Sequence, residues 1–277
     1  MGKIIFVTFA DQKYYTSLER IKQEILRFNC IDEVYFCTEK ELEKNFIHSM
    51  CYKRHRRGFG YWKWKPYLVK KFLDSIDYGD ILIYSDVGNE FNIGGLTRFR
   101  EYIDLVDNSE SGILVFSEKY IEKYWTKGDL LNYLNLYDKK EYIDTLQIWS
   151  GCFFLKKTCA SKLLVDDWFS LHMDHYDLTT DKRSKVPNHK GFMEHRHDQS
   201  TFSLLVKRFS FICIKNNEVY PIDGSWQSME LCPILAKRNK QKPHPIILWK
   251  LSFPFRFLLG VYLILFEKMH YRFSWWY

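Results

Sequence analysis

The opening of the chain most constrains its fold. Residues 3–9 are β-branched and aromatic, residues 17–28 carry apolar side chains at helical spacing, and residues 33–38 form a second β-rich run. A strand, a helix and a strand in this order predict two parallel strands joined by a right-handed crossover. Nucleotides bind beyond the carboxyl ends of such strands. The opening therefore predicts an α/β domain with a ligand site at that edge of its sheet.

The rest of the chain continues this pattern. Residues 81–84 are an unbroken apolar run, which is typical of a strand covered on both faces. Pro66 suits the first turn of a helix, where its missing N–H would have no partner. Further strands are predicted at residues 113–116, 152–155 and 209–214, and further helices at 67–73, 163–173 and 199–207. With a boundary expected near Pro233, the domain is predicted to span residues 1–235 and a basic, aromatic tail residues 236–277.

Composition limits the partners and the compartment. The net charge of +7 and the aromatic share of 18% suit nucleic acid, anionic lipid or a diphosphate-bearing substrate. The seven cysteines form no CxxC pair, which argues for a reducing compartment and against both zinc and a disulfide framework. The N-terminal apolar run is too short for a signal peptide. We therefore expect a cytoplasmic protein.

Asp86 is the first candidate for chemistry. It follows the apolar run of residues 81–84, so its carboxylate is expected in the open crevice above the sheet. A leaving diphosphate gains negative charge as a glycosidic bond breaks, and one divalent cation held by one or two carboxylates neutralises it. The alternative is a structural role, in which Asp86 caps a turn before Gly88.

Residues 56–67 combine glycines, alternating tryptophan and lysine, and a helix start. A helix N-terminus favours phosphate, Lys63 and Lys65 add positive charge, and Trp62 can stack on a base or a sugar. Two alternatives remain open for this segment. Its aromatic side chains can face the core with the lysines in solvent, or the mixture can bind nucleic acid.

Two further segments precede predicted elements. Asp198, between His197 and Gln199, stands before a helix and is either a general base or an N-terminal cap. Gly151 enters a strand, where a glycine allows close approach to a ligand and also suits any tight turn.

Taken in order, these segments resemble a group of bacterial polysaccharide and O-antigen glycosyltransferases with GT-A-like folds. The matching stretches are residues 6–10, 60–66, 80–88 and 197–200. The resemblance implies a GT-A-like, Rossmann-like fold with a mixed, mainly parallel sheet flanked by helices. It also implies that Asp86 takes the first position of a DxD-type element, which binds a metal and the donor diphosphate. The third position is Gly88, so a divalent cation, Mn²⁺ or Mg²⁺, would depend on Asp86 alone or on Asn89 or Glu90.

The resemblance also assigns roles to the remaining candidates. Asp198 is expected to be the catalytic or sugar-positioning carboxylate. Gly151, His197 and Gln199 are expected to position the sugar or the acceptor. The donor and its diphosphate are expected to contact Thr8, Trp62, Lys63, Lys65, Asp86, Gly88 and Arg238.

The tail points to a membrane surface. Its longest uncharged run, residues 257–266, is too short to span a bilayer, but basic and aromatic residues around an apolar stretch suit a helix lying in an anionic interface. The alternative is a helix packed on the domain.

The sequence thus predicts a hexosyltransferase-type enzyme of surface polysaccharide (lipopolysaccharide or capsule) synthesis. It would sit on the inner face of the cell membrane and act on a glycan or lipid-linked glycan acceptor. Nucleic acid is not an expected partner. The rivals are a nucleic-acid-binding protein, which would show steeply salt-dependent binding, and a non-catalytic binder of sugar nucleotides at a membrane surface.

Overall fold

A computed structural model describes residues 2–50 and 57–239. The strands of this part of the chain form a six-stranded sheet and a two-stranded sheet. The larger sheet contains β1 (Ile4–Phe9), β2 (Glu33–Cys37), β3 (Ile81–Ser85), β5 (Ile113–Ile121), β6 (Leu146–Lys156) and β7 (Ile212–Ile214). The smaller sheet pairs β4 (Glu90–Phe91) with β8 (Ile234–Leu235).

The order of the larger sheet is β2-β1-β3-β6-β5-β7. Its pairs β1–β2, β1–β3 and β5–β7 are parallel, whereas β6 runs antiparallel to both β3 and β5. The predicted class, a mixed, mainly parallel sheet flanked by helices, is therefore confirmed. Because β6 is reversed, it enters the sheet where β3 leaves, and Ser85 pairs with Cys152.

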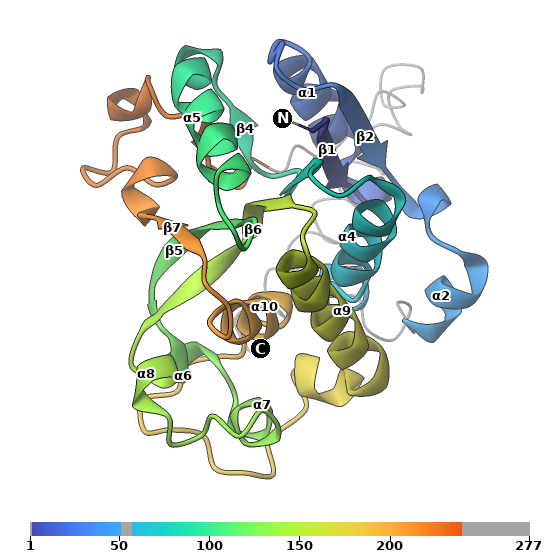
Figure 1. Cartoon of the computed structure of the whole chain (residues 1–277). Helices are drawn as coiled ribbons and strands as arrows, with labels where there is room; N and C mark the ends of the chain where they lie inside the picture. The colour runs from blue at the N-terminus through green and yellow to red at the C-terminus, as the bar shows by residue number, and fades with distance from the viewer. Residues whose placement is uncertain (1, 51–56, 240–277) are drawn as a thin grey trace, which may run out of the picture. The chain divides into compact units, whose positions relative to one another are not determined.

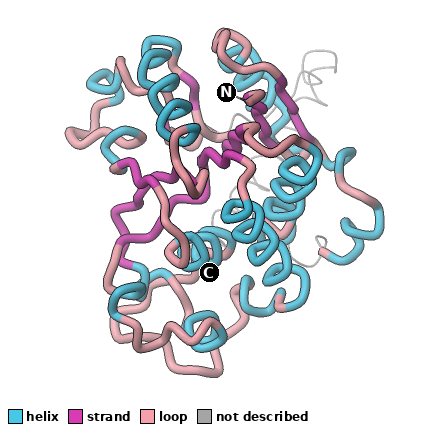
Figure 2. Tube along the Cα trace, viewed as in Figure 1, coloured by secondary structure: helices cyan, strands magenta, loops and turns pink. Residues whose placement is uncertain are grey.

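Helices surround this sheet, as Figure 2 shows. The longer ones are α1 (Tyr15–Ile25), α4 (Trp64–Ser75), α5 (Leu96–Asp107), α9 (Cys159–Asp174) and α10 (Asp198–Val206). The shorter α-helices are α2 (Lys44–Ser49), α3 (Gly58–Tyr61), α6 (Glu122–Trp125), α7 (Gly128–Tyr133) and α8 (Lys140–Ile143). Short 3₁₀ helices cover Gln12–Tyr14, Glu39–Glu41, Ile93–Gly95, Tyr176–Thr179, Asn216–Glu218 and Trp226–Met229.

Each face of the sheet has its own core. Successive side chains of a strand point to opposite faces, so Ile5 and Val7 of β1 join one cluster while Ile4 and Phe6 join the other. The first cluster is completed by α4, α9 and α10, and the second by α1 and α5. Figure 1 shows α4 beside α9, against which it packs. Burial on both faces explains why β1 and β3 are apolar except for one small hydroxyl residue in each, Thr8 and Ser85.

Every strand and helix expected between residues 3 and 214 is present, with shifted ends. Pro66 is the third residue of α4 and lies in its first turn, as its missing N–H predicts. Strand β6 is much longer than the expected residues 152–155 because it continues along β5 past two irregularities in the register. No described helix is long and apolar enough to cross a membrane. Most of the predicted tail, residues 240–277, lies outside the described residues, and the boundary at residue 235 stays a prediction.

Candidate active site

Two adjoining cavities open at the carboxyl ends of β1 and β3. The polar cleft has a volume of about 390 Å³, and the aromatic pocket beside it about 130 Å³. The polar cleft is lined by Arg57, Trp62, Lys65, Asp86, Gly88, Asn89, Trp149, Ser150, Gly151, Glu194, Arg196, His197, Asp198, Gln199, Tyr220 and Arg238. Trp62, Asp86 and Gly88 line both cavities. The cavities therefore form one continuous site at the edge of the sheet that the β-α-β opening predicts.

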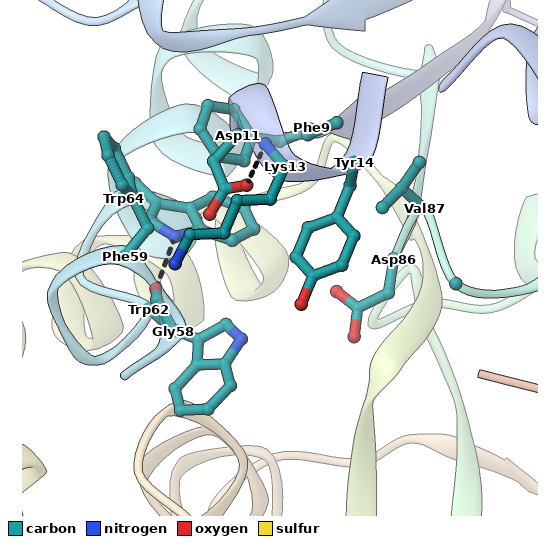
Figure 3. Close-up of a pocket in the computed structure, with 12 residues that line it drawn as sticks. Phe9, Asp11, Lys13, Tyr14, Gly58, Phe59, Trp62, Trp64, Asp86 and Val87 are labelled. Atoms are coloured by element: carbon teal, nitrogen blue, oxygen red, sulfur yellow. Dashed lines mark hydrogen bonds between the residues drawn. The ribbon is translucent and has the colours of Figure 1, made fainter. Parts of the chain in front are cut away.

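The aromatic pocket is built around the end of β1. Phe9 stacks on Trp64 at 4.1 Å between ring centroids, and Phe59 lies beside Phe9 at 6.1 Å. Asp11, Lys13 and Tyr14 come from the loop and 3₁₀ helix that follow the strand. Figure 3 shows Tyr14 and Asp86 pointing toward one another across the open space. Flat apolar walls with a few polar groups at the rim suit a planar, partly polar ligand.

The loop that carries Asp86 and Gly88 is held from several sides. The backbone N–H of Asp86 donates to the carbonyl of Gly151 at 2.8 Å, and the Asn89 side chain donates to the same carbonyl at 2.8 Å. Arg20 of α1 donates to the carbonyl of Val87 at 2.8 Å. These bonds fix the loop, so Asp86 is presented by rigid backbone.

Lys65 joins the two candidate carboxylates. Its Nζ lies 2.6 Å from Oδ2 of Asp198 and 3.1 Å from Oδ1 of Asp86, and only 1% of the side chain is exposed. The side chain of Asp198 is 7% exposed and that of Asp86 37%. Two hydroxyl groups complete the cluster: Ser150 donates to Asp198 at 2.9 Å, and Tyr84 donates to Asp86 at 2.8 Å. Asp86 is thus the carboxylate that a ligand in either cavity can reach.

Burial and charge act in opposite directions on this cluster. Burial by itself lowers the pKa of Lys65, but the carboxylates of Asp198 and Asp86 outweigh it and hold that pKa above its ordinary value. Burial raises the pKa of Asp198, opposed by the Lys65 ammonium. Lys65 therefore stays charged at neutral pH, and its charge is already met by acidic side chains.

Residues 58–62 form a left-handed helical turn between the two cavities. Gly58, Phe59, Gly60, Tyr61 and Trp62 all have positive φ, from 50° to 87°. Tyr61 N donates to Arg57 O and Trp62 N to Gly58 O, the i to i−4 pattern of an α-helix in the opposite hand. Each non-glycine residue in this conformation costs roughly 1–2 kcal/mol. Such strain is typical of functional sites, where surrounding structure enforces it.

His197 closes one wall of the polar cleft. Its ring stacks on Trp62 at 5.3 Å between centroids, and its Nδ1 lies 2.8 Å from the carbonyl of Thr179. Burial lowers the pKa of His197 to about 4, so the ring is neutral at pH 7. Arg57 lies at the rim, where it pairs with Asp181 at 3.0 Å and with Glu194 at 3.5 Å. The rim thus joins the left-handed turn to the segment before α10.

Most residues predicted from the sequence line the site. Trp62, Lys65, Asp86, Gly88, Gly151, His197, Asp198, Gln199 and Arg238 all line the polar cleft. A Cβ at Gly151 would lie 2.4 Å from the Trp149 ring, which by itself accounts for the glycine, and the contact of Gly151 with a sugar stays a prediction. Among the described residues, Arg238 forms no ion pair at contact distance, but it hydrogen-bonds to Tyr220 and lies close enough to Glu118 to interact with its charge.

Two predicted donor contacts lie elsewhere. Thr8 is fully buried in the middle of the sheet, in β1, and lines neither cavity. Lys63 is 5% exposed and holds its Nζ 4.9 Å above the Tyr176 ring, away from both cavities. Both residues are close in sequence to residues that line the cavities. The alternation of β1 turns the Thr8 side chain into the core, and the turn that ends at Trp62 does the same for Lys63. Their contact with the donor stays a prediction that the lining of the two cavities does not support.

Several residues of the site were not predicted. Tyr84 lines neither cavity but donates to Asp86, and it was recognisable in principle, since it stands two positions before Asp86 and shares its side of an extended chain. Ser150 is adjacent to Gly151 and was equally accessible to pattern reasoning. Glu194 and Arg196 immediately precede His197 and were within reach of the same reasoning, whereas Tyr220 carries no local signal, because only the tertiary fold brings its segment to the cleft.

The described residues do not form an all-protein site for a divalent cation. Oxygen-rich cation sites gather several carboxylates or carbonyls around one point, and the described residues hold no such group of three or more acidic, histidine or cysteine side chains. Asp86 and Asp198 share the Lys65 ammonium instead. Of the two proposed substitutes, Glu90 pairs with Lys237 at 2.7 Å, whereas Asn89 lines the cleft and is held by donation of its amide N–H groups to Ser85 and Gly151.

Comparisons with known proteins give structural similarity only. No protein-family model matches the sequence, and no curated protein matches it. A glycosyltransferase involved in glycosylation of the major capsid of PBCV-1 is similar over 84% of this chain and 91% of that one, with 12% identity and a TM-score of 0.45. Mouse xyloside xylosyltransferase 1 is similar over 88% of this chain and 100% of its own, with 11% identity and a TM-score of 0.45. The galactosyltransferase LgtC, with donor and acceptor sugar analogues, covers 87% and 84%, with 12% identity and a TM-score of 0.42.

Proposed function

We propose that this protein is a glycosyltransferase that moves a sugar from a nucleotide-diphosphate donor to a hydroxyl group of a glycan. The observation that carries the proposal is the pair of cavities that meet at Trp62, Asp86 and Gly88. One is flat and aromatic, as a nucleobase requires, and the other is polar and large enough for a sugar. The site stands beyond the carboxyl ends of β1 and β3, where nucleotides bind in α/β folds.

The charges in the polar cleft suit the two halves of such a donor. Asp86 and Asp198 outnumber the Lys65 ammonium between them, so this cluster carries excess negative charge. Carboxylates of this kind accept hydrogen bonds from sugar hydroxyls and stabilise the positive charge that develops on the sugar ring. We assign Asp198 the sugar-positioning role, because Lys65 and Ser150 already hold its Oδ2. Arg238 and Lys13, one in each cavity, are assigned to the diphosphate.

The acceptor has a place next to the polar cleft. A further cavity of about 480 Å³ shares Tyr220 and Arg238 with the cleft and is also lined by Glu118, Asn216 and Asn217. Amide and carboxyl groups form hydrogen bonds with sugar hydroxyls, and tyrosine rings pack against sugar faces, so this lining suits a sugar acceptor. The sequence resemblance to bacterial polysaccharide enzymes supports a surface glycan as the acceptor. The basic, aromatic tail supports one that is linked to lipid, reached from the inner face of the cell membrane.

A donor panel tests the proposal. UDP-, GDP- and dTDP-sugars are screened for thermal stabilisation, which a bound ligand produces by mass action, and positive donors are then assayed for release of nucleoside diphosphate. We expect one donor to bind and to be hydrolysed slowly without acceptor. Asp86→Asn should lower this turnover by at least about a hundredfold, the scale of a lost transition-state contact, in a protein that still unfolds cooperatively and is folded at the assay temperature.

The matched control is Asp104→Asn, which removes an exposed carboxylate from α5 that lines neither the polar cleft nor the aromatic pocket. It should turn over like the wild type. Stabilisation by a donor without turnover, with or without glycan acceptors, would identify a non-catalytic binder. If no sugar nucleotide stabilises the protein and nucleic acid binds instead with a steep salt dependence, the proposal is wrong.

A further inference from the structure

The Lys65 ammonium is enclosed by oxygen atoms. Besides Asp198 at 2.6 Å and Asp86 at 3.1 Å, it donates to the carbonyl of Ser150 at 3.3 Å. The Tyr84 ring lies 5.4 Å from Nζ on another side. A buried ammonium is costly unless acidic partners compensate it. Two carboxylates and a carbonyl around one cation are also the ligand types that Mg²⁺ and Mn²⁺ take in proteins.

Three elements fix this arrangement. Lys65 lies in the first turn of α4, and its backbone N–H donates to the carbonyl of Trp62 at 2.9 Å, at the end of the left-handed turn. Asp198 is the first residue of α10, where the helix dipole favours a carboxylate. Asp86 is held by the bond of its N–H to Gly151. The ammonium is therefore part of a rigid core rather than a side chain that swings away when a ligand arrives.

We propose that Lys65 is a built-in cation, which takes the position between Asp86 and Asp198 that a divalent metal ion would otherwise hold, so that the site works without metal. The part of this inference that concerns catalysis rests on the proposed function. The part that concerns cation binding does not, because it follows from the two carboxylates alone.

Charge explains why the two cations exclude one another. One ammonium between two carboxylates leaves the cluster with excess negative charge, and a divalent ion added beside it would face a like charge at contact distance. Removal of the ammonium leaves two carboxylates that lie on either side of one vacated position. Such a pair binds a hard cation or takes up a proton.

The test is a Mn²⁺ titration followed by electron paramagnetic resonance, in which bound Mn²⁺ loses its free-ion signal. Wild-type protein, stripped with EDTA, should bind no Mn²⁺ in the cleft. Lys65→Ala should gain a site for about one Mn²⁺ per chain, at least about tenfold tighter than any wild-type binding. The ion should also raise the thermal stability of Lys65→Ala and not that of the wild type.

Two variants control the gain. Lys65→Ala combined with Asp198→Asn removes one carboxylate and should abolish the new site. Lys70→Ala offers a matched case on the same helix, because Lys70 also contacts two carboxylates, Asp74 and Asp166. Those two remain paired with Lys162, so this variant should gain no Mn²⁺.

The outcomes separate the two proposals. The inference is overturned if the wild type binds Mn²⁺ tightly and Asp86→Asn removes that binding. It is also overturned if Lys65→Ala folds but gains no Mn²⁺ site. If Lys65→Ala does not fold, the wild type decides: a donor-dependent activity or donor-induced stabilisation that EDTA abolishes and Mn²⁺ restores overturns it. A gain of Mn²⁺ by Lys65→Ala in a protein that binds no sugar nucleotide would leave the built-in cation standing and remove the proposed function.

Discussion

His172, His195 and His197 are buried beside and behind the polar cleft. Burial lowers the pKa of His172 to about 3 and that of His195 well below its ordinary value, as it does for His197. His172 Nε2 lies 2.9 Å from the Thr201 hydroxyl, which fixes the ring inside the packing of α9 and α10. These rings are therefore neutral in the folded protein over most of the accessible pH range.

The buried histidines predict acid instability. In the unfolded chain each titrates near pH 6.5, whereas in the folded protein His172 titrates near 3. The stability that neutral burial provides is present above pH 6.5 and is lost as the pH falls toward the folded pKa. Each such histidine contributes a slope of up to about 1.4 kcal/mol per pH unit in that window.

Urea unfolding at several pH values measures this slope. Between pH 6.5 and 4, the free energy of unfolding of His172→Phe should fall less steeply with pH than that of the wild type. The difference in slope should correspond to the uptake of about one proton on unfolding. Equal slopes in the two proteins would show that His172 does not titrate differently on folding.

At the scale of elements, the left-handed turn of residues 58–62 decides where Trp62 lies. Gly58 has φ +56°, and a Cβ there would stand 2.3 Å from the Trp62 ring. Gly224 has φ +74° and open space around its Cβ position. Replacement of either glycine by alanine therefore carries the cost of a positive φ, but only at Gly58 does the new Cβ also clash with a neighbouring side chain.

Gly58→Ala should therefore be more damaging than Gly224→Ala. Both variants should lose about 1–2 kcal/mol because alanine disfavours positive φ. Only Gly58→Ala should also displace Trp62, weaken donor binding and shift the tryptophan fluorescence. Donor binding by Gly58→Ala at the wild-type level would show that the position of Trp62 does not matter for the ligand.

The same scale shows what could be read from the sequence. Apolar runs predicted β1 and β3, and the position of Asp86 after a buried strand predicted its place in the cleft. The glycines at 58 and 60 indicated a break before α4, but five consecutive residues of positive φ are set by packing against His197 and Met50, not by local propensity. The reversal of β6 was equally hidden, since alternation and hydrophobicity do not record strand direction. Lys65 was predicted at the site, but its two carboxylate partners were not predicted to share it.

At the scale of the whole molecule, residues 236–277 carry the proposal of a membrane surface. Basic residues at 237–242 precede an apolar stretch at 246–266, and most of this tail lies outside the described residues. Full-length protein should sediment with vesicles that contain anionic lipid, and a version truncated after residue 239 should stay in the supernatant.

Vesicles of zwitterionic lipid and a salt series are the controls for this experiment. Binding should be weaker to zwitterionic vesicles than to anionic ones, and it should weaken as salt is added, because the basic residues are attracted by the negative surface potential. A full-length protein that remains in the supernatant beside the truncated one would remove the membrane proposal and leave the catalytic one untouched.

The bond between Lys65 and Asp198 joins residues 133 positions apart. During synthesis, the lysine and Asp86 leave the ribosome long before α10 exists, so the growing chain must carry the ammonium with one of its two partners missing. The polar cleft is accordingly a late product of folding, completed only after α10 docks and Tyr220 and Arg238 reach the cleft. Sugar-nucleotide binding would then report on maturation of the whole domain, and would stabilise none of its shorter nascent forms.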